Sequence, residues 1–117
     1  MSVRLHQDVL RVDRIRLRRW YSTPEDYAEM SRCFDFMITR IVENPEEGVP
    51  CKRPPLLGWR RVKFHSKHRP PKGVRADMRI VFRQQDGDIQ VLCVGKRMVG
   101  HPDDVYQEAH QRDQESW

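Results

Sequence analysis

The sequence predicts an α+β domain, with a small antiparallel sheet of about four strands, two N-terminal helices on one face and a short C-terminal helix. Three observations support this prediction. Residues 24–43 carry apolar side chains at helical spacing, residues 59–67 and 78–84 alternate apolar and polar side chains, and residues 89–94 are apolar on both faces. The chain has 117 residues, which suits one domain, since domains typically have roughly 100–200 residues.

The N-terminal half is predicted to be mainly helical. Ser2–His6 is interpreted as a short strand, and Asp8–Trp20 as a helix. The next helix has the clearest signals, because Thr23 is a good N-cap, Pro24 suits the first helical position, and Asn44-Pro45 ends the helix. Its apolar stripe, expected to face the core, consists of Tyr27, Met30, Phe34, Met37, Ile38 and Ile41.

Three strands are predicted after an extended, proline-rich connector at residues 46–57. The period of two places Val62 and Phe64 on the core side of the first strand. A hairpin turn is expected at Gln85–Asp88, and Asp103 or Asp104 can cap the C-terminal helix. Residues 1–112 are expected to form the single domain, and residues 113–117 to be a frayed tail. The helices are expected to cover one face of the sheet and to leave the other face open.

The charge of the chain is concentrated in one segment. The whole chain has a net charge of +5, whereas residues 52–83 hold eleven basic side chains and one acid, Asp77, for a net +10. Residues 1–51 and 84–117 have net charges of −1 and −4. Such a segment predicts a surface that binds an anion, with nucleic acid as the leading partner. A surface that serves only solubility usually mixes both signs of charge.

Composition also restricts where the protein is expected to act. No run reaches the roughly 18 apolar residues of a membrane span, so no membrane partner is expected. The N-terminal residues lack the apolar stretch of a secretory signal, and the three cysteines form no C-x-x-C pair. These features predict a cytoplasmic protein with reduced thiols.

The predicted open face carries a cationic cluster. Arg61, Lys63 and His65 project from it at intervals of about 6.6–7 Å, with Arg79 and Arg83 on the neighbouring strand. Such a cluster can bind phosphates and can stabilise the charge that builds up during phosphoryl transfer. Composition alone favours the simpler reading, a phosphate-binding face without chemistry. No metal site and no cofactor are expected, because His65-x-x-His68 has no accompanying Cys or carboxylate ligands and no glycine-rich nucleotide motif is present.

Two C-terminal motifs carry a family resemblance. Residues 89–97 read Ile-Gln-Val-Leu-Cys-Val-Gly-Lys-Arg, and residues 104–112 read Asp-Val-Tyr-Gln-Glu-Ala-His-Gln-Arg. Together with the strands that contain Arg61-x-Lys63-x-His65 and Arg79-Ile-Val-Phe, they resemble the RelE family of toxin ribonucleases over residues 57–112. The wider RelE/ParE superfamily shares the strand that ends in a basic pair after glycine, so the resemblance implies the fold more firmly than the activity.

The resemblance implies a ribosome-dependent mRNA endonuclease that cuts in the ribosomal A site without a metal. The ribose 2′-OH attacks the adjacent phosphate and leaves a 2′,3′-cyclic phosphate and a 5′-OH. Residues in matching positions, implied to be catalytic, are Arg61, Lys63, Arg79, Arg97 and Tyr106. The family has lysine where this chain has Arg61, and arginine does not release its proton in proteins. The general base is therefore expected to be Lys63 or His65, and the alternative for His65 is a phosphate contact at the rim.

The resemblance also implies partners. A cognate acidic antitoxin, the ribosome and mRNA are expected, and a toxin–antitoxin complex of higher order is compatible with the sequence. Two other functions stay open: a ParE-like toxin that inhibits DNA gyrase, and a basic RNA-binding module without activity. Further side chains are expected to contact RNA: Lys67, Arg69, Lys72, Arg75, Arg83 and Lys96.

Overall fold

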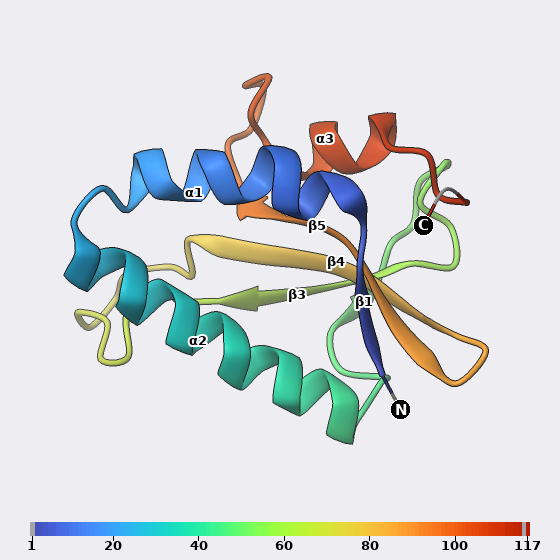
Figure 1. Ribbon diagram of the computed structural model, residues 1–117, viewed down its shortest axis with the longest axis horizontal. Helices are drawn as coiled ribbons and strands as arrows, with labels where there is room; N and C mark the ends of the chain where they lie inside the picture. Colours follow the sequence, from blue (N-terminus) through green and yellow to red (C-terminus); the bar gives the residue numbers. More distant parts are fainter. Residues whose placement is uncertain (1, 116) are drawn as a thin grey trace.

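Two helices pack as one layer on a sheet in the computed structural model, which describes residues 2–115 and 117 (Figure 1). The α+β prediction is confirmed. In chain order the described elements are β1 (Val3–Leu5), a π-helical turn η1 (Val9–Asp13), α1 (Arg14–Trp20), α2 (Pro24–Glu43), β2 (Val49–Pro50), β3 (Arg60–Phe64), β4 (Met78–Gln85), β5 (Asp88–Lys96) and α3 (Val105–Gln111).

The described strands form a five-stranded sheet in the order β1-β5-β4-β3-β2. Neighbouring strands from β2 to β5 are antiparallel, but β1 runs parallel to β5. The sheet is therefore mixed, with one strand more than the antiparallel sheet predicted. The helical crossover between β1 and the later strands allows the parallel pairing. The extra strand, β2, lies inside the segment expected to be a connector, and its two residues pair with Arg60 and Arg61.

The local signals for helices are confirmed. Thr23 Oγ1 accepts a hydrogen bond from the Asp26 backbone at 3.1 Å, so α2 begins with the predicted N-cap. The π-helical turn η1 runs directly into α1, and together they form the predicted first helix. The hairpin turn is also confirmed: Asp86 and Gly87 have φ values of 54° and 81°, which is the left-handed pair of a type I′ turn.

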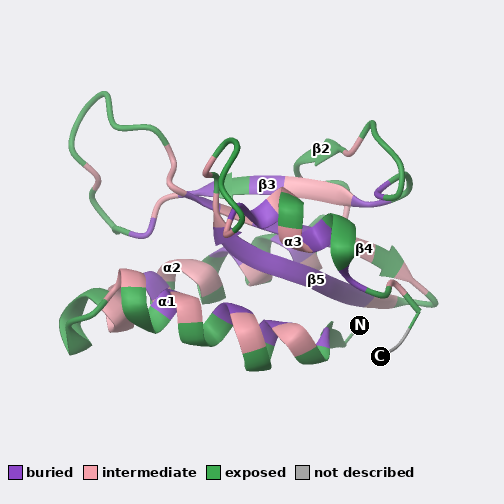
Figure 2. Ribbon diagram, turned by 90° about the horizontal axis from the view of Figure 1, so that it is seen from above, coloured by how far each residue is buried: buried purple, intermediate pink, exposed green. Residues whose placement is uncertain are grey.

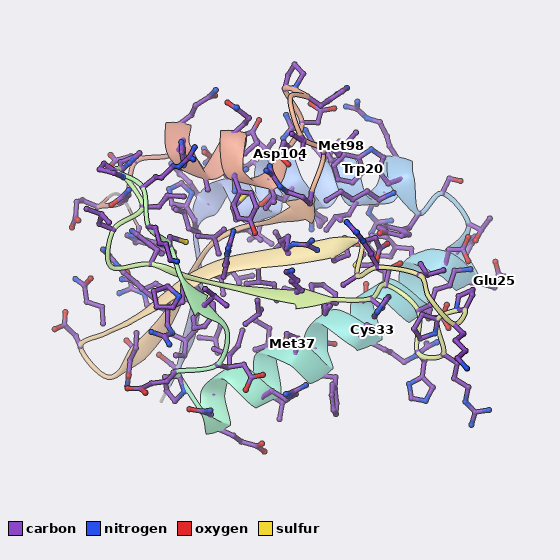
Figure 3. All side chains as sticks on the ribbon, turned by 180° about the vertical axis from the view of Figure 1, so that it is seen from behind. Trp20, Glu25, Cys33, Met37, Met98 and Asp104 are labelled. Carbon is purple, nitrogen blue, oxygen red and sulfur yellow. The ribbon has the colours of Figure 1, made fainter. Side chains whose placement is uncertain are left out.

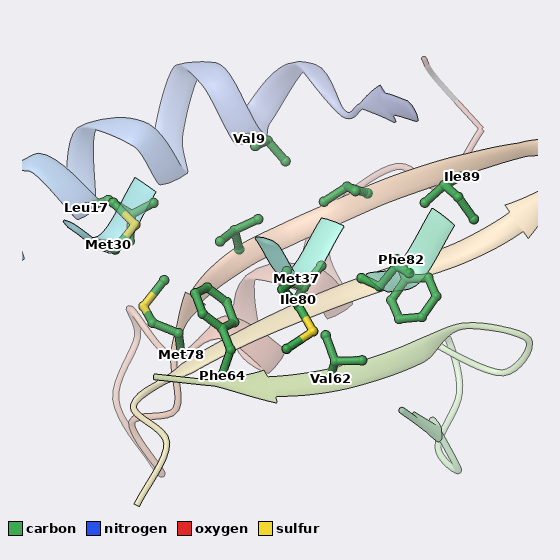
Figure 4. Packing of buried hydrophobic residues seen from close by; sticks show 13 residues of the cluster. Val9, Leu17, Met30, Met37, Val62, Phe64, Met78, Ile80, Phe82 and Ile89 are labelled. Carbon is green, nitrogen blue, oxygen red and sulfur yellow. The ribbon is translucent and has the colours of Figure 1, made fainter. Parts of the chain in front are cut away.

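The main hydrophobic core lies between the sheet and the helices α1 and α2 (Figure 4). The predicted stripe of α2 faces it, with Met30, Met37 and Ile41 buried and its other members packed against the cluster. The buried members of this core are Val9, Leu17, Met30, Met37, Ile41, Val62, Phe64, Met78, Ile80, Phe82, Ile89, Val91 and Val94. Alternate residues of β3 and β4 face this side, as the period of two predicts.

A second, smaller core covers part of the opposite face of the sheet, where α3 packs. Its buried members are Leu56, Trp59, Val81, Leu92, Cys93, Val105 and Ala109. A β-bulge opposite Val81 and Phe82 leaves Leu92 without a pairing partner in β4, which explains why the adjacent residues Leu92 and Cys93 belong to the same core. The expectation of an entirely open face is therefore wrong, because the apolar side of α3 needs this face for burial (Figure 2).

The described residues of the C-terminal tail, 113–115 and 117, contact the domain, whereas residue 116 of the predicted frayed tail lies outside the described residues. The Asp113 carbonyl lies 2.9 Å from Nε2 of the buried His6. Gln114 accepts a hydrogen bond from Trp59 Nε1 at 3.1 Å, and the ring of Trp117 stacks on Trp59 with 6.2 Å between centroids. A frayed tail was expected because chain termini are often poorly ordered, and the stacking of Trp117 on Trp59 is a contact between distant residues that this rule does not consider.

A buried ion pair joins the two ends of this architecture. Arg112, just after α3, makes two hydrogen bonds to the Asp13 carboxylate at 2.6 and 2.7 Å, and one to the Leu92 carbonyl at 2.8 Å. The Asp13 carboxylate also accepts the Val94 backbone N–H at 2.9 Å. Burial opposes the charge of Arg112, but the hydrogen bonds and charge of Asp13 outweigh it and raise the pKa of the guanidinium above its ordinary value.

We expect Arg112→Met to lower the free energy of unfolding by about 3–5 kcal/mol, because it leaves the Asp13 carboxylate buried without its partner. Urea denaturation measures this loss. The double variant Asp13→Asn/Arg112→Met should recover at least half of it, since the asparagine oxygen still accepts the Val94 N–H. A single-variant loss below about 1 kcal/mol would contradict the central role of this pair.

Candidate nucleic-acid interface

A cleft of about 440 Å³ opens on the α3 side of the sheet. Three parts of the chain form its walls: the segment between β2 and β3, the strand β3 itself, and the region from the end of β5 to α3. We call it the basic cleft, and its lining residues are Cys51, Lys52, Arg53, Leu56, Arg61, Arg97, Asp104, Tyr106, Gln107 and His110. Four of these ten side chains are permanently cationic, so the cleft suits an anion.

The centre of the basic cleft is the ring of Tyr106 with two guanidinium groups near it. The Cζ atom of Arg97 lies 4.8 Å from the ring centroid, and that of Arg61 lies 5.6 Å away. Both distances fall within the range of cation–π attraction. Residues from β3 and from the loop after β5 are thus gathered around one half-buried aromatic ring.

Asp104 fixes two members of this group. It is buried, caps α3, and accepts hydrogen bonds from Arg97 Nη1 at 2.7 Å and from the Tyr106 backbone N–H at 3.2 Å. The Met98 backbone N–H also donates to this carboxylate, which lies at the start of α3 beside Met98 (Figure 3). One buried anion therefore positions a guanidinium and the aromatic ring before any ligand binds.

Lys63 and Arg79 form a second basic pair on the same face. They are direct cross-strand partners in β3 and β4, and Lys63 is exposed two residues along β3 from Arg61. Arg79 Nη1 donates to the carbonyl oxygens of Ala76 and Met78 at 2.8 and 3.0 Å. The guanidinium of Arg79 is therefore partly occupied by its own backbone, and neither residue lines the basic cleft.

His65 lies apart from the basic cleft. It borders a second cavity of about 700 Å³ between α2 and the loop after β3, which Lys63, Lys67 and His68 also line. The strand β3 ends at Phe64, so the alternation that would place His65 beside Lys63 and Arg61 no longer applies. The structure thus brings Arg61, Arg97 and Tyr106 together and leaves His65 on the α2 side.

The loop between β3 and β4, residues 65–77, holds most of the predicted RNA contacts. Lys67, Arg69, Lys72 and Arg75 are all exposed on it, and it projects from the sheet (Figure 2). Its base is closed by Asp77, which accepts hydrogen bonds from the Ser66 backbone, the Ser66 hydroxyl and the Tyr21 hydroxyl. Burial acts to raise the pKa of Asp77, but these hydrogen bonds outweigh it and hold the pKa below the ordinary value.

Two further side chains predicted to contact RNA interact with other groups of the protein instead. Arg83 donates to Gln90 at 2.7 Å and lies over the ring of Trp59 at 4.2 Å, under the docked C-terminal tail. Lys96 Nζ lies 4.9 and 5.4 Å from the rings of Tyr21 and Trp20 at the end of α1. Neither residue lines the basic cleft, so both serve packing in this structure.

Sequence reasoning assigned no site role to seven of the ten residues that line the basic cleft: Cys51, Lys52, Arg53, Leu56, Asp104, Gln107 and His110. A signal for the last two was present, because positions 106, 107 and 110 share one face of a helix. Lys52 and Arg53 had no such signal, since the path of the proline-rich segment over β3 depends on the pairing of β2.

Comparison of the chain with family models, with curated proteins and with solved structures finds no match. None of these comparisons identifies a family for the chain. Among residues 2–115 and 117, no helix combines the length and the apolar character that a membrane crossing requires. Within the same part of the chain, no group of three or more His, Cys, Asp or Glu side chains is arranged to hold a metal ion.

We expect Asp77→Asn to lower the free energy of unfolding at neutral pH by about 1–2 kcal/mol, because it replaces a charged hydrogen-bond acceptor by a neutral one. The expected loss is modest because the carboxylate is only half-buried and solvent weakens its interactions. The folded-state pKa of Asp77 lies below the ordinary 3.8, so its carboxylate stabilises the fold above that pH and loses this effect as the pH falls through the folded-state pKa.

Urea denaturation between neutral and acidic pH measures this effect. The difference between the wild-type protein and Asp77→Asn should narrow in acid, whereas Asp35→Asn, an exposed change on α2, should behave like wild type throughout. A difference that does not vary with pH would rule out the proposed electrostatic role of Asp77.

Proposed function

We propose that this chain is a ribosome-dependent mRNA endonuclease of the RelE type, the toxin of a toxin–antitoxin pair. The observation that carries the proposal is the basic cleft, in which Arg61 and Arg97 lie against the ring of Tyr106. A half-buried aromatic ring beside guanidinium groups is an arrangement that can bind a stacked base together with its phosphate. The resemblance of residues 57–112 to RelE toxins supplies the reaction.

The reaction needs charge stabilisation more than any other contribution. Attack by the ribose 2′-OH on the adjacent phosphate places extra negative charge on the non-bridging oxygens. Arg61 and Arg97 supply fixed donors there, and Asp104 holds Arg97 in place before the substrate arrives. Tyr106 orients the nucleotide by stacking. Lys63 is the residue proposed to take the 2′-OH proton, because it lies within β3 two residues from Arg61, whereas His65 lies beyond the end of β3.

The charged surroundings of the cleft suit a large RNA partner. Lys52 and Arg53 extend the basic cleft along the segment before β3, and the exposed cations of the loop 65–77 continue the positive surface. Ribosomal RNA and mRNA both present a dense array of phosphates. An acidic antitoxin would satisfy the same charges, so the proposed partners compete for one surface.

One observation favours a different function, a basic RNA-binding module without activity. Arg61 replaces the lysine that RelE toxins have, and arginine does not accept or release a proton. A cleft that binds RNA but lacks effective proton transfer would show binding without cleavage.

We expect Arg97→Ala to slow cleavage by about 10²–10³-fold, because removal of one preorganised donor to a developing charge has this effect in other enzymes. Tyr106→Ala should also slow cleavage. Tyr106→Phe should retain the contribution to the cleavage rate that comes from stacking and lose only the contribution of the hydroxyl. Toeprinting of a translated message with the purified protein measures the A-site cuts. Arg4→Ala, an exposed change on β1 at the far edge of the sheet, is the control.

The same assay distinguishes the alternatives. Ribosome or RNA binding with an intact message would identify the RNA-binding module. An intact message together with inhibited DNA supercoiling by gyrase would identify the ParE-like toxin. Either result contradicts the endonuclease proposal.

A second expected outcome concerns salt. Replacement of Lys67, Arg69 and Lys72 by glutamine should reduce the slope of log affinity against log salt concentration by up to about 2–3, since each phosphate contact contributes about 0.7–0.9. Binding of labelled RNA or ribosomes at several salt concentrations measures the slope. Cleavage at saturating protein should change little, and an unchanged slope would place the RNA contact elsewhere on the surface.

A further inference from the structure

The inference concerns proton transfer in the basic cleft and rests on the proposed function. In-line cleavage of RNA needs two proton transfers: the 2′-OH loses its proton, and the departing 5′-oxygen gains one. The proposed function assigns the first transfer to Lys63 and leaves the second without a residue. A general acid must lie in the cleft itself, within hydrogen-bond reach of the bound phosphate.

Few groups in the basic cleft can donate that proton. Arg61, Arg97 and Arg53 retain their protons. Asp104 is buried, and its oxygens already accept hydrogen bonds from Arg97 and from two backbone N–H groups. Tyr106 is already assigned to stacking, and Lys52 belongs to the segment between β2 and β3.

The two remaining titratable groups are a thiol and an imidazole. Burial raises the pKa of the Cys51 thiol, and the nearby charge of Arg61 offsets this only in part, so Cys51 is a weak acid here. His110 is exposed and lines the same cleft. Imidazole is the side chain whose ordinary pKa lies near neutrality, which suits proton donation at physiological pH.

The position of His110 fits this role. It lies four residues after Tyr106 on α3, so the two side chains are neighbours on one face of the helix, with about 5–6 Å between their Cβ atoms. A nucleotide stacked on Tyr106, with its phosphate at Arg61 and Arg97, would place the adjacent 5′-oxygen toward one end of that ring. The imidazole is the proton donor available on the α3 wall.

We propose that His110 is the general acid of the cleavage reaction. The 2′-oxygen forms a bond to phosphorus while its proton passes to the neutral amine of Lys63. The bond between phosphorus and the 5′-oxygen breaks, and the 5′-oxygen receives a proton from the imidazolium of His110. The products are the 2′,3′-cyclic phosphate and the 5′-OH, with a neutral imidazole and a protonated lysine that later exchange protons with water.

His110 also lies in the last turn of α3, where a cation interacts favourably with the helix dipole. A purely structural role there would affect cleavage through the position of Tyr106. The test must therefore separate proton donation from structure.

The experiment compares His110→Gln with wild type on two synthetic messages in ribosome complexes, with cleavage followed at saturating protein over a range of pH. One message is ordinary RNA, and the other carries sulfur in place of the 5′-oxygen at the A-site cleavage position. A sulfur leaving group departs without protonation. His101→Gln, an exposed change outside the basic cleft, is the matched control.

For ordinary RNA, His110→Gln should lose about 10²–10⁴-fold in rate, and the fall in rate at high pH should disappear from its profile. For the sulfur-containing message, its rate should approach that of wild type. An equal loss on both messages, or a normal rate and profile on ordinary RNA, would overturn the assignment of His110. Absence of cleavage by the wild-type protein would instead overturn the proposed function.

Discussion

The buried pair between Arg112 and Asp13 is the interaction on which the candidate site depends. It joins the junction of η1 and α1 to the end of α3, 99 residues apart, and it ties both to the backbone of β5. A helix as short as the seven residues of α3 is not stable alone, so its position depends on packing and on this pair. Tyr106 and His110 form a wall of the basic cleft only while α3 is held in this way.

The basic cleft gathers like charges around one aromatic ring, and this arrangement costs stability when the cleft is empty. Arg61 and Arg97 both approach Tyr106, while Lys52 and Arg53 add charge at the rim. Of the residues that line the cleft, only Asp104 is an anion, and it is committed to Arg97 and to backbone groups. A bound polyanion relieves this repulsion, and the relief contributes to the free energy of binding.

The features that sequence alone could predict are those with local signals. The cap at Thr23, the α2 stripe, the alternation in β3 and the turn at Asp86-Gly87 each depend on neighbouring residues, and the structure confirms them. The parallel pairing of β1, the short strand β2 and the docking of Trp117 depend on contacts between distant residues. Arg97 and Tyr106 came from the family resemblance, and Arg61 came from the strand alternation as well. The same alternation was extended to His65, but β3 ends one residue before it.

The residues that form the two hydrophobic cores are different from those proposed to act on RNA. The main core lies on the face of α1 and α2, and the second core supports α3 from beneath through Val105 and Ala109. The groups proposed to act on RNA, such as Arg97 and His110, are exposed and belong to neither core. Exposed substitutions away from caps and buried networks usually change stability little, but Arg97 is hydrogen-bonded to the buried cap residue Asp104, so its replacement also affects the start of α3. Asp104 belongs to both groups, since it is buried, caps α3 and positions Arg97, and its replacement would disturb stability and activity together.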